Sequence, residues 1–597
     1  MKLVRLKITD PKGFRSLPCG FEHHFRSEWT LQDELDNTEG FAPFVCAGPN
    51  GSGKSNLLEV LAAIFYNLEC MVLGNLPDSF LYDKDENPKG FNSANSIPSG
   101  FELEYWIKPK DSDLPGYAKV LISKETEQSP KVHWQNRDQF YKDHNPLSRE
   151  ETRSLLPEYL LGYSSGENEI LSLPFFKIRF IQFDEYWQAL RDQLPYRGTP
   201  ESRLVYLDSS FSQAILLSNF LFQDDSTLAP FREEVGIESL REFRIVLKRS
   251  VPLSPDIVNL FGKKHPCVYE GVDENTYRLN LLKLLEADEN SADNFDPIIT
   301  RLKRCATSSF EDRQTDSLYL DYFVNESAYD AFQNNFGSAL GLFQAFQVLL
   351  TLNLYTVSEP LKADLYQSKS HYISETVPTL ASDERIMRFK NFYFTKQGVD
   401  QPMLLKELSD GEYQLLHSLG LCLLFRNTNS LFLLDEPETH FNPDWRANFI
   451  SRLRQCFPTK KDEEEKPDKD IFSQEMLITT HTPFLISDSK PEKVLVFNKD
   501  KTTGEVSISH PEYNTLGASI NKITMNTFGK RETIGAYAQG ILDKLRKRFE
   551  QGGEDNEALI NEIHQQLGDS VEKLLLIKAI LANEENASKE DSEEGSP

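Results

Sequence analysis

The chain has 597 residues, too many for one compact core, which predicts about two to four domains. It carries 65 Lys and Arg against 92 Asp and Glu, a formal net charge of −27. This acidic balance argues against a protein coated in nucleic-acid-binding surface, although it leaves room for one local basic groove. The seven cysteines form no CxxC pair, which favours reduced thiols in a cytosolic protein over a disulfide framework or a zinc site.

The N-terminus predicts a strand. Residues 1–8 alternate apolar and basic side chains, which is not the pattern of a signal peptide. No apolar run in the sequence approaches the roughly 18 residues that a membrane span needs. The sequence therefore predicts a cytoplasmic protein without membrane contact.

Residues 48–55 read Gly-Pro-Asn-Gly-Ser-Gly-Lys-Ser. The apolar run 44–47 before them predicts a buried strand, and residues 56–65 after them show helical spacing of apolar side chains. Strand, glycine-rich loop, Lys-Ser and helix form the pattern of a phosphate-binding P-loop. Backbone N–H groups of such a loop point at phosphate oxygens, and the helix N-terminus adds partial positive charge.

The P-loop assigns roles to individual residues. Lys54 is expected to reach the β- and γ-phosphates of a nucleotide, and the Ser55 hydroxyl to bind Mg²⁺. The predicted nucleotide-contacting residues of this segment are Asn50, Gly51, Ser52, Gly53, Lys54, Ser55 and Asn56.

The segments after the P-loop helix change character twice. Alternating runs at 101–107, 117–122 and 131–134 predict antiparallel strands with one wet face. From 136 to 380 the pattern is mixed, and its many prolines exclude a long coiled coil. We predict a globular, mainly helical insertion there, with helices near 149–161, 211–222 and 328–356 and a core in 332–355.

The last part of the chain returns to apolar strands. Strands are predicted at 385–395, 431–435, 475–481 and 493–498, and helices at 408–425 and 443–456. The charged run 460–470 predicts a solvated loop. Beyond 511 the pattern is helical, and the acidic tail from Glu584 predicts disorder.

Asp435 ends the apolar run that starts at Leu431. A buried strand that delivers one carboxylate at its C-terminal end is the Walker B pattern, in which the Asp holds Mg²⁺ directly or through water. Glu436 follows, where a general base could polarise the attacking water. A single Asp-Glu pair is common in acidic turns, but the P-loop requires a Walker B strand elsewhere in the chain.

Ser409 and Glu412 form a capping box before an apolar run, so a well-capped helix is the simplest interpretation. The box lies 26 residues before Asp435 (435 − 409), where ABC-type ATPases carry their signature motif. By that resemblance Ser409 and Gly411 would face the γ-phosphate bound by an opposite subunit. A similar S-x-G-E match at 163–168 has no Walker B strand at that distance, and we interpret it as a decoy or a loop of unknown role.

His481 ends the strand 475–481, 45 residues after Glu436 (481 − 436). A single histidine at a strand end is more often structural than catalytic. In this context it matches the switch histidine that contacts the γ-phosphate and the attacking water.

Together these elements resemble the ABC-type ATPase heads of the RecF/SMC class, which includes the OLD-like ATPases. The run 435–443, Asp-Glu-Pro-Glu-Thr-His-Phe-Asn-Pro, is similar to the Walker B and D-loop of OLD-like enzymes, with Asn442 where His is usual. The turn 13–16, Gly-Phe-Arg-Ser, resembles the class motif whose basic residue, here Arg15, lies near the phosphates. The 381 residues between Lys54 and Asp435 (435 − 54) fit this class better than a transporter ATPase.

The resemblance is closest to ATPases found beside restriction and other antiphage systems, and it covers 1–70 and 385–500. It implies ATP and Mg²⁺ as cofactors, with Gln182 as a candidate for the glutamine that contacts Mg²⁺. It also implies a homodimer or higher homo-oligomer, a partner effector nuclease and DNA as a further partner. No Toprim or His-Asn-His nuclease pattern follows residue 500, so nuclease activity in this chain is not expected.

We therefore predict an α/β fold, an ABC-type P-loop ATPase head with a mixed sheet, flanking helices and an antiparallel β-lobe. The predicted division is 1–135 for the N-terminal half of the head, 136–380 for the insertion, 381–510 for the C-terminal half and 511–597 for a helical segment with an acidic tail. The predicted function is an ATPase that forms head-to-head ATP-sandwich dimers and regulates an effector nuclease in antiphage defence. A DNA-repair or chromosome-maintenance ATPase, or an OLD-like nuclease with an unrecognised active site, is the alternative.

Overall fold

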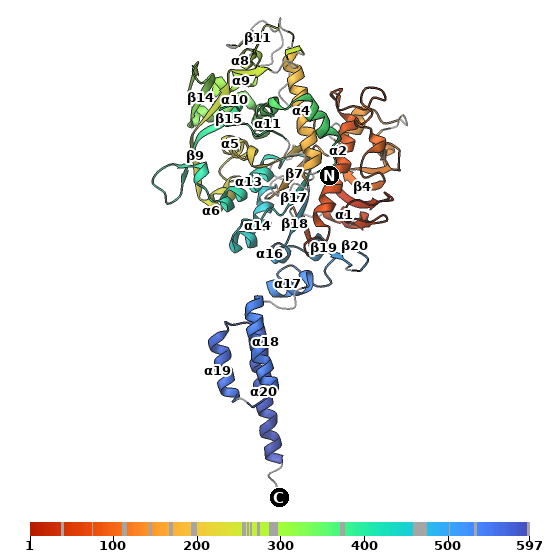
Figure 1. Ribbon diagram of the computed structural model, residues 1–597, viewed down its shortest axis with the longest axis vertical. Helices are drawn as coiled ribbons and strands as arrows, with labels where there is room; N and C mark the ends of the chain where they lie inside the picture. The colour runs from red at the N-terminus through yellow and green to blue at the C-terminus, as the bar shows by residue number, and fades with distance from the viewer. Residues whose placement is uncertain are drawn as a thin grey trace.

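The computed structural model describes residues 1–597 except 37–40, 75, 110–115, 142–145, 166–170, 193–199, 254–257, 260–261, 263–264, 272–274, 286–296, 371–376, 458–473, 501, 530–533, 554 and 594–597. A broad head comprises the described residues up to 529. Three helices of residues 536–593 project from it as a stalk (Figure 1).

A seven-stranded sheet runs through the head in the order β20-β19-β3-β18-β17-β7-β8. All neighbouring strands are parallel except the β19–β20 pair at the edge. The inner strands are short and buried on both faces, as expected for a parallel sheet covered by helices. Their bounds are β3 Phe44–Ala47, β7 Tyr159–Ser164, β8 Leu204–Tyr206, β17 Ser430–Asp435, β18 Glu475–Thr480, β19 Val494–Lys499 and β20 Val506–Ser509.

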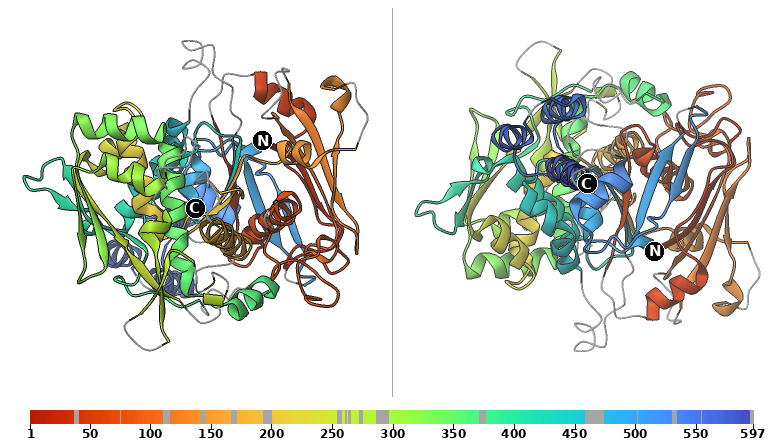
Figure 2. Two further views of the ribbon diagram at one scale, coloured as in Figure 1. Left: turned by 90° about the horizontal axis from the view of Figure 1, so that it is seen from above. Right: turned by 90° about the horizontal axis from the view of Figure 1, so that it is seen from below.

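An antiparallel sheet and helix α2 (Lys54–Val72) cover one face of the central sheet. The sheet has the order β2-β1-β4-β5-β6, and its strands alternate buried and wetter side chains, which confirms the predicted β-lobe. Figure 2 shows this lobe in red and orange on one side of the head. The bounds are β1 Lys2–Ile8, β2 Glu22–His24, β4 Phe101–Ile107, β5 Ala118–Lys124 and β6 Lys131–Trp134.

Helices and a second antiparallel sheet cover the opposite face. The sheet has the order β13-β14-β9-β15-β16, with bounds β9 Ile237–Lys248, β13 Ser308–Asp312, β14 Ser317–Phe323, β15 Met387–Lys396 and β16 Met403–Leu404. Four longer helices contribute buried residues to the same core: α5 Ser212–Phe222, α11 Ala339–Thr351, α13 Asp410–Leu424 and α14 Pro443–Cys456. The helix α14 and the strands β15, β17, β18 and β19 agree with their predicted ranges within two residues.

Smaller elements complete the head. The remaining helices are α1 Glu28–Asp36, α3 Arg149–Ser154, α4 Ser172–Arg191, α6 Ala229–Val235, α8 Leu281–Leu285, α9 Ile298–Cys305, α10 Glu326–Phe336, α12 Glu359–Gln367, α16 Pro483–Ser487 and α17 Ile520–Phe528. A small sheet joins β10 Ser250–Leu253, β11 Val268–Glu270 and β12 Tyr277–Asn280.

The segment 136–380 is richer in helix than in strand, as predicted, but it is not separate from the head. Its strand β7 pairs with β17 inside the central sheet, and its strand β9 pairs with β15 of the C-terminal half. Residues 155–161 were predicted as the end of a helix, whereas β7 begins at Tyr159. Strands on the two sides of the predicted boundaries at 136 and 380 thus belong to the same sheets. Pairing with distant strands, and not local sequence alone, determines whether such short apolar runs form strands.

Among the residues that the structure describes, two helices have the length and hydropathy of a membrane span, Lys54–Val72 and Ala339–Thr356. In the head, 78% and 61% of these apolar windows are buried against other parts of the protein. The first of them begins in the P-loop. Both are thus accounted for as core helices packed on the two faces of the central sheet.

A buried ion pair ties the β-lobe to the central sheet. Arg26, after β2, lies 2.5 Å from Glu475 at the start of β18, and both side chains are 1% exposed. Glu475 also accepts a hydrogen bond from the Leu3 backbone, and the Arg26 guanidinium donates to the Leu3 carbonyl. The first strand of the chain is thereby fixed to a strand more than 470 residues later.

The stalk has its own small core. Helices α18 Ala536–Gln551, α19 Asn556–Gln566 and α20 Val571–Glu593 bury a set of seven apolar residues separate from both cores of the head: Leu542, Leu545, Leu559, Ile563, Leu567, Leu576 and Ile580. The tail from Glu584 was predicted to be disordered, but the backbone of α20 is helical to Glu593. The charged run 460–470 lies outside the described residues.

Candidate nucleotide-binding site

The predicted P-loop connects β3 to α2 at the carboxyl edge of the central sheet. Gly53 precedes α2 with φ 101°, in the left-handed region that favours glycine. A Cβ on Gly48 would lie 2.6 Å from the Phe497 carbonyl oxygen of the neighbouring strand β19. Glycine at these two positions therefore lets the loop turn tightly against the sheet edge.

The side chains of Lys54 and Ser52 lie on the concave side of the P-loop. Lys54 Nζ donates to the carbonyl oxygens of Gly48 (3.0 Å) and Pro49 (3.1 Å), and burial lowers the pKa of Lys54. The Ser52 hydroxyl is buried and has no hydrogen-bond partner among the described residues. A phosphate in the loop would satisfy both groups, so the residues present fit that ligand.

The remaining predicted residues of the P-loop and of the turn 13–16 surround the start of α2. Asn50 and Gly51 form the exposed tip of the loop. Asn56, on α2, donates from its amide to the Ser16 hydroxyl at 2.6 Å, so the turn 13–16 packs against the start of α2. Arg15 has φ 53° and pairs with Glu59 of α2 at 2.9 Å.

The Walker B aspartate lies beside the P-loop helix. Ser55 Oγ donates to Asp435 Oδ1 at 2.9 Å, and Thr479 Oγ1 of β18 donates to the same oxygen at 2.5 Å. Burial raises the pKa of the Asp435 carboxyl. Hydroxyl and carboxylate oxygens are ligands that Mg²⁺ prefers, so the pair fits the predicted magnesium site.

Glu436 and His481 face each other at the same edge. His481 Nε2 lies 2.7 Å from Glu436 Oε1, and each side chain is 35% exposed. The hydrogen bond to His481 lowers the pKa of Glu436, which favours the charged carboxylate. Glu436 has φ 50°, unusual for a residue with a side chain, and its backbone N–H donates to Thr479 Oγ1.

Strand order explains why these residues meet. β18, which ends before His481, lies between β3 of the P-loop and β17 of the Walker B motif, and all three strands are parallel. Their carboxyl ends therefore reach one edge of the sheet. Residues from three distant segments converge there on the space above Ser55.

Ser165 is a site residue that was not predicted from the sequence. This residue follows β7, whose last residue Ser164 pairs with Asp435. Ser165 Oγ bonds to the Glu436 carbonyl oxygen at 2.5 Å and to Thr439 Oγ1 at 2.7 Å, so it braces the left-handed turn at Glu436. The match at 163–168 is thus next to the site, although Gly166, Glu167 and Asn168 lie outside the described residues. Only strand pairing reveals this position.

Glu438 is a second residue of the site that was not predicted. It is buried, accepts a hydrogen bond from Thr480 Oγ1, and has an Oε2 atom without a partner among the described residues. Burial raises the pKa of Glu438 to about 7. Thr480 directly precedes His481, so this contact joins the segment after Glu436 to the histidine strand.

The capping box at Ser409 is present and begins α13. Ser409 is exposed, and its hydroxyl bonds to Glu412 of its own helix. A Cβ on Gly411 would lie 2.8 Å from the His440 carbonyl oxygen, so the helix packs closely on the segment after Walker B. The geometry leaves Ser409 facing outward, and its role toward a second subunit stays a prediction.

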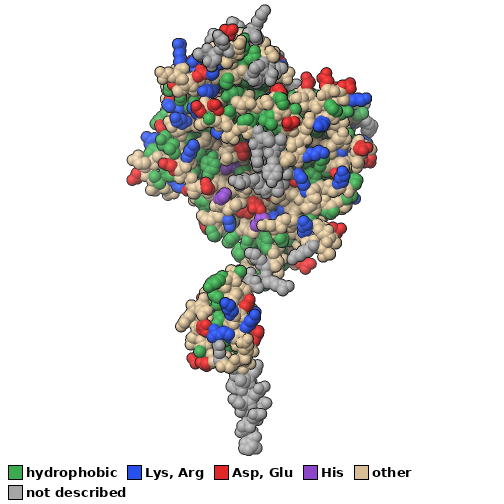
Figure 3. All heavy atoms as spheres, viewed as in Figure 1, with side chains coloured by type: hydrophobic (Ala, Val, Ile, Leu, Met, Phe, Trp, Pro, Cys, Tyr) green, Lys and Arg blue, Asp and Glu red, His purple; other side chains and the backbone are tan. Residues whose placement is uncertain are grey.

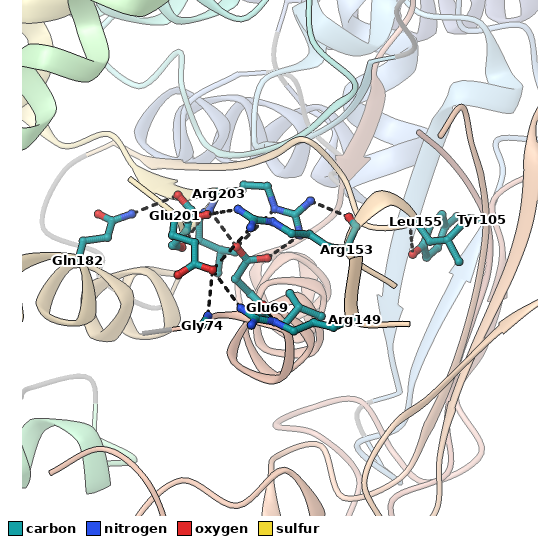
Figure 4. Close-up of polar contacts among 12 residues, drawn as sticks. Glu69, Gly74, Tyr105, Arg149, Arg153, Leu155, Gln182, Glu201 and Arg203 are labelled. Atoms are coloured by element: carbon teal, nitrogen blue, oxygen red, sulfur yellow. Dashed lines mark hydrogen bonds and ion pairs between the residues drawn. The ribbon is translucent and has the colours of Figure 1, made fainter. Parts of the chain in front are cut away.

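The prediction of Gln182 as a magnesium ligand is wrong. Gln182 is buried in α4, and its amide donates to the Ser202 carbonyl at 3.4 Å (Figure 4). Ser202 precedes β8, and Leu204 of β8 pairs with Leu160 near the start of β7. Gln182 therefore lies at the amino edge of the parallel strands, opposite the edge that carries Asp435.

Comparison with known proteins gives one family match. Residues 273–487 match AAA_21, described as "AAA domain, putative AbiEii toxin, Type IV TA system". The matched range includes Ser409, Asp435, Glu436 and His481, and the P-loop lies before it. No curated protein matches the chain.

Solved structures with detected similarity include two Smc heads. One, from Pyrococcus furiosus, has an extended coiled coil and is bound to the C-terminal domain of ScpA; identity is 12%, coverage is 91% of this chain and 99% of that one, and the TM-score is 0.28. The other is an Smc head bound to the C-winged helix domain of ScpA, with 11% identity, 86% and 98% coverage, and a TM-score of 0.29. TM-scores this low add nothing to what the strand topology shows.

The strand order, the β-lobe and the P-loop agree with the predicted head fold, and the family match covers its second half as far as residue 487. The chain is a mixed α/β protein that contains a P-loop sequence between β3 and α2 and a segment, 273–487, similar to an AAA domain family.

Proposed function

We propose that the chain is a Mg²⁺-dependent ATP hydrolase. The observation that carries this proposal is the convergence of Ser55, Asp435, Glu436 and His481 at one sheet edge beside Lys54. Lys54 would exchange its bonds to the loop carbonyls for bonds to phosphate oxygens, which are charge-assisted and stronger.

Ser55 and Asp435 would hold Mg²⁺, which when bound neutralises charge on the phosphate oxygens. Glu436 would orient the attacking water and accept its proton at Oε1 or Oε2. His481, whose Nε2 faces Glu436, would keep that carboxylate charged and correctly oriented. The proposal assigns contacts with the nucleotide to Asn50, Gly51, Ser52, Gly53, Lys54, Ser55 and Asn56.

The proposal includes a head-to-head dimer. Ser409 is exposed at the N-terminus of α13, and backbone N–H groups of a helix N-terminus favour an anion. We infer that Ser409 and Gly411 of one copy cover the ATP held by Lys54 of the other. ATP would then bind the closed dimer better than the free chain and shift the population toward it.

The cellular role that we favour is regulation of a partner effector nuclease in bacterial antiphage defence, in the cytoplasm. The description of the matched family, which names a toxin of a toxin–antitoxin system, supports a defence role. A RecF/SMC-like role on DNA is the alternative. On the face in Figure 3, Lys and Arg are interspersed with Asp and Glu, which favours a protein partner over a broad DNA-binding surface there.

Replacing Glu436 with Gln tests the catalytic assignment. Glu436→Gln should bind ATP but hydrolyse it about 10²–10⁴-fold more slowly, because a general base is removed. Lys54→Ala should lose ATP binding in calorimetry while keeping its thermal unfolding profile. Unchanged turnover in Glu436→Gln, or normal ATP affinity in Lys54→Ala, would refute the assignment.

Light scattering tests the dimer. Glu436→Gln should gain mass with Mg-ATP, and Glu436→Gln/Ser409→Arg should not, because the bulky side chain blocks closure. The matched control is Glu436→Gln/Ser519→Arg, which makes the same change at the exposed N-cap serine of α17. If ATP leaves the mass of Glu436→Gln unchanged, or if both arginine variants behave alike, the sandwich proposal fails.

A nuclease assay separates the alternatives. We predict that the purified chain alone does not cut DNA or RNA with Mg²⁺ or Mn²⁺. Cleavage that persists in Lys54→Ala and follows the protein through several columns would favour the nuclease alternative.

A further inference from the structure

A groove of about 590 Å³ opens at the edge of the head. One wall is the segment 18–22, which leads into β2. The other wall is the β19–β20 hairpin, through residues 498–500 and 505–508. The walls are nearly 480 residues apart in the sequence, and the β19–β20 pair is labelled at the lower edge of the head in Figure 1.

The groove adjoins the P-loop, because residues of or next to both of its walls contact Gly53. Val506, which lines the groove, has its Cγ1 atom 3.2 Å from where a Cβ on Gly53 would lie. Ser16, just before the other wall, has its hydroxyl 2.8 Å from the same point and accepts a hydrogen bond from Asn56. The two walls therefore flank the start of α2.

Sheet geometry fixes this position. β19 runs parallel to β3 and extends past its end, since Val496 pairs with Ala47 and the strand continues to Lys499. The chain then turns back, and Val506 pairs with Lys499. The tip of the hairpin thus stands above the same carboxyl edge that carries the P-loop.

The lining suits a flat molecule with a polar rim. Pro18, Val506 and Ile508 supply apolar surface, and Asn498, Glu505 and Ser507 supply hydrogen-bond donors and acceptors. The volume falls within the range of about 300–1,000 Å³ typical of small-molecule sites. A nucleobase with its ribose has apolar faces and polar edges of this kind.

We propose that this groove holds the base and ribose of the nucleotide whose phosphates lie in the P-loop. The inference rests on the proposed function, since it presumes that the loop binds a nucleoside triphosphate. It adds that affinity depends on the nucleoside through residues of the β19–β20 hairpin, whereas inorganic tripolyphosphate would occupy the loop and leave the groove open.

The chain contains a natural reporter for this groove. Cys19 lines it and is exposed, while the other six cysteines are buried. N-ethylmaleimide should therefore alkylate Cys19 first, and intact-mass spectrometry gives the rate. With ATP at ten times its Kd, alkylation should slow about tenfold, because only about one protein in eleven remains free. ADP at the same saturation should protect equally, and tripolyphosphate should not protect.

A pair of tryptophan variants tests the hairpin wall. Ser507→Trp fills the groove from an exposed position on β20 and should raise the Kd for ATP but not for tripolyphosphate. Ser309→Trp makes the same change at an exposed position of the edge strand β13, outside the groove lining, and should leave both affinities unchanged.

The outcomes separate this inference from the proposed function. Equal protection of Cys19 by ATP and tripolyphosphate, or ATP binding in calorimetry without protection, would overturn the groove assignment and leave the ATPase proposal standing. An absence of ATP binding in calorimetry would refute the proposed function and this inference with it.

Discussion

Removing the buried charge of Glu475 should strongly destabilise the head. In Glu475→Gln the Arg26 guanidinium stays buried, 1% exposed, and keeps only its longer ion pair with Glu34 at 3.2 Å. Breaking a buried ion pair on one side costs about 3–5 kcal/mol where the remaining charge is uncompensated. Because Glu34 still pairs with Arg26, we expect a loss near the lower end of this range. The amide of Gln is nearly isosteric, so packing around Leu3 changes little and the loss reports on charge.

The contribution of Glu475 to the stability of the head should decrease at acidic pH. Burial opposes the charge of Glu475, but Arg26 and Lys2 outweigh it and hold the pKa at about 2. In the unfolded chain a Glu titrates near about 4.3. The contribution to stability is therefore fully present above about pH 4.3 and is lost as the pH falls toward 2.

Urea unfolding followed by tryptophan fluorescence measures this effect in the head alone, since all five tryptophans precede residue 446. The control is Glu28→Gln, which breaks the Glu28–Lys119 pair of the same lobe; these side chains are 66% and 30% exposed. Exposed pairs contribute about 0–1 kcal/mol. If Glu475→Gln costs no more than Glu28→Gln, or if the wild-type head keeps its stability at pH 3, the reasoning is wrong.

Three further predictions follow from packing, burial and the separate stalk core. Gly411→Ala should destabilise the head by about 1–3 kcal/mol, because the new Cβ would lie 2.8 Å from the His440 carbonyl oxygen; urea unfolding followed by tryptophan fluorescence measures this. The control Gly540→Ala on α18 places its Cβ in open space and should be neutral or stabilising when unfolding is followed by circular dichroism. Burial raises the pKa of Glu438 to about 7, above that of an unfolded Glu, so its contribution to stability is lost as the pH rises through 7. The stability of Glu438→Gln relative to wild type should therefore increase between pH 5 and pH 7, by up to about 1.4 kcal/mol for each pH unit. An equal difference in urea unfolding at both pH values would contradict this. Ending the chain at residue 529 should leave the tryptophan unfolding transition unchanged, because the core of α18–α20 is separate; a loss of several degrees would show that the stalk supports the head.

Apolar runs that end in a motif were predictable from the sequence. The runs at 44–47, 431–435 and 475–480 have buried side chains, and each is a strand in the structure. The first leads into the P-loop, the second ends in Asp435, and the third leads into His481. The helix predicted at 443–456 has these bounds in the structure, where the Asn442 side chain caps its N-terminus. These signals are local, so one sequence carries them.

Features that depend on distant pairing were not predictable. β7 is a six-residue run that periodicity cannot distinguish from a buried helix, and only its pairing with β17 makes it a strand. Ser165 could be placed beside Glu436 only once the pairing of β7 with β17 was known, because no sequence pattern predicts this contact. Gln182 was chosen by residue type and chain position, and neither says which edge of a sheet a residue occupies.

The position of β3 has a consequence for the order of synthesis. Both of its sheet neighbours, β18 and β19, lie more than 420 residues later in the chain. At about 5–20 residues per second, a ribosome makes the P-loop strand on the order of 20–90 s before its neighbours exist. A nascent or prematurely ended chain thus displays an intact P-loop sequence without a sheet to hold it. Under the proposed function, only chains translated to about residue 500 would bind nucleotide, so truncated products would neither compete for ATP nor join the proposed dimer.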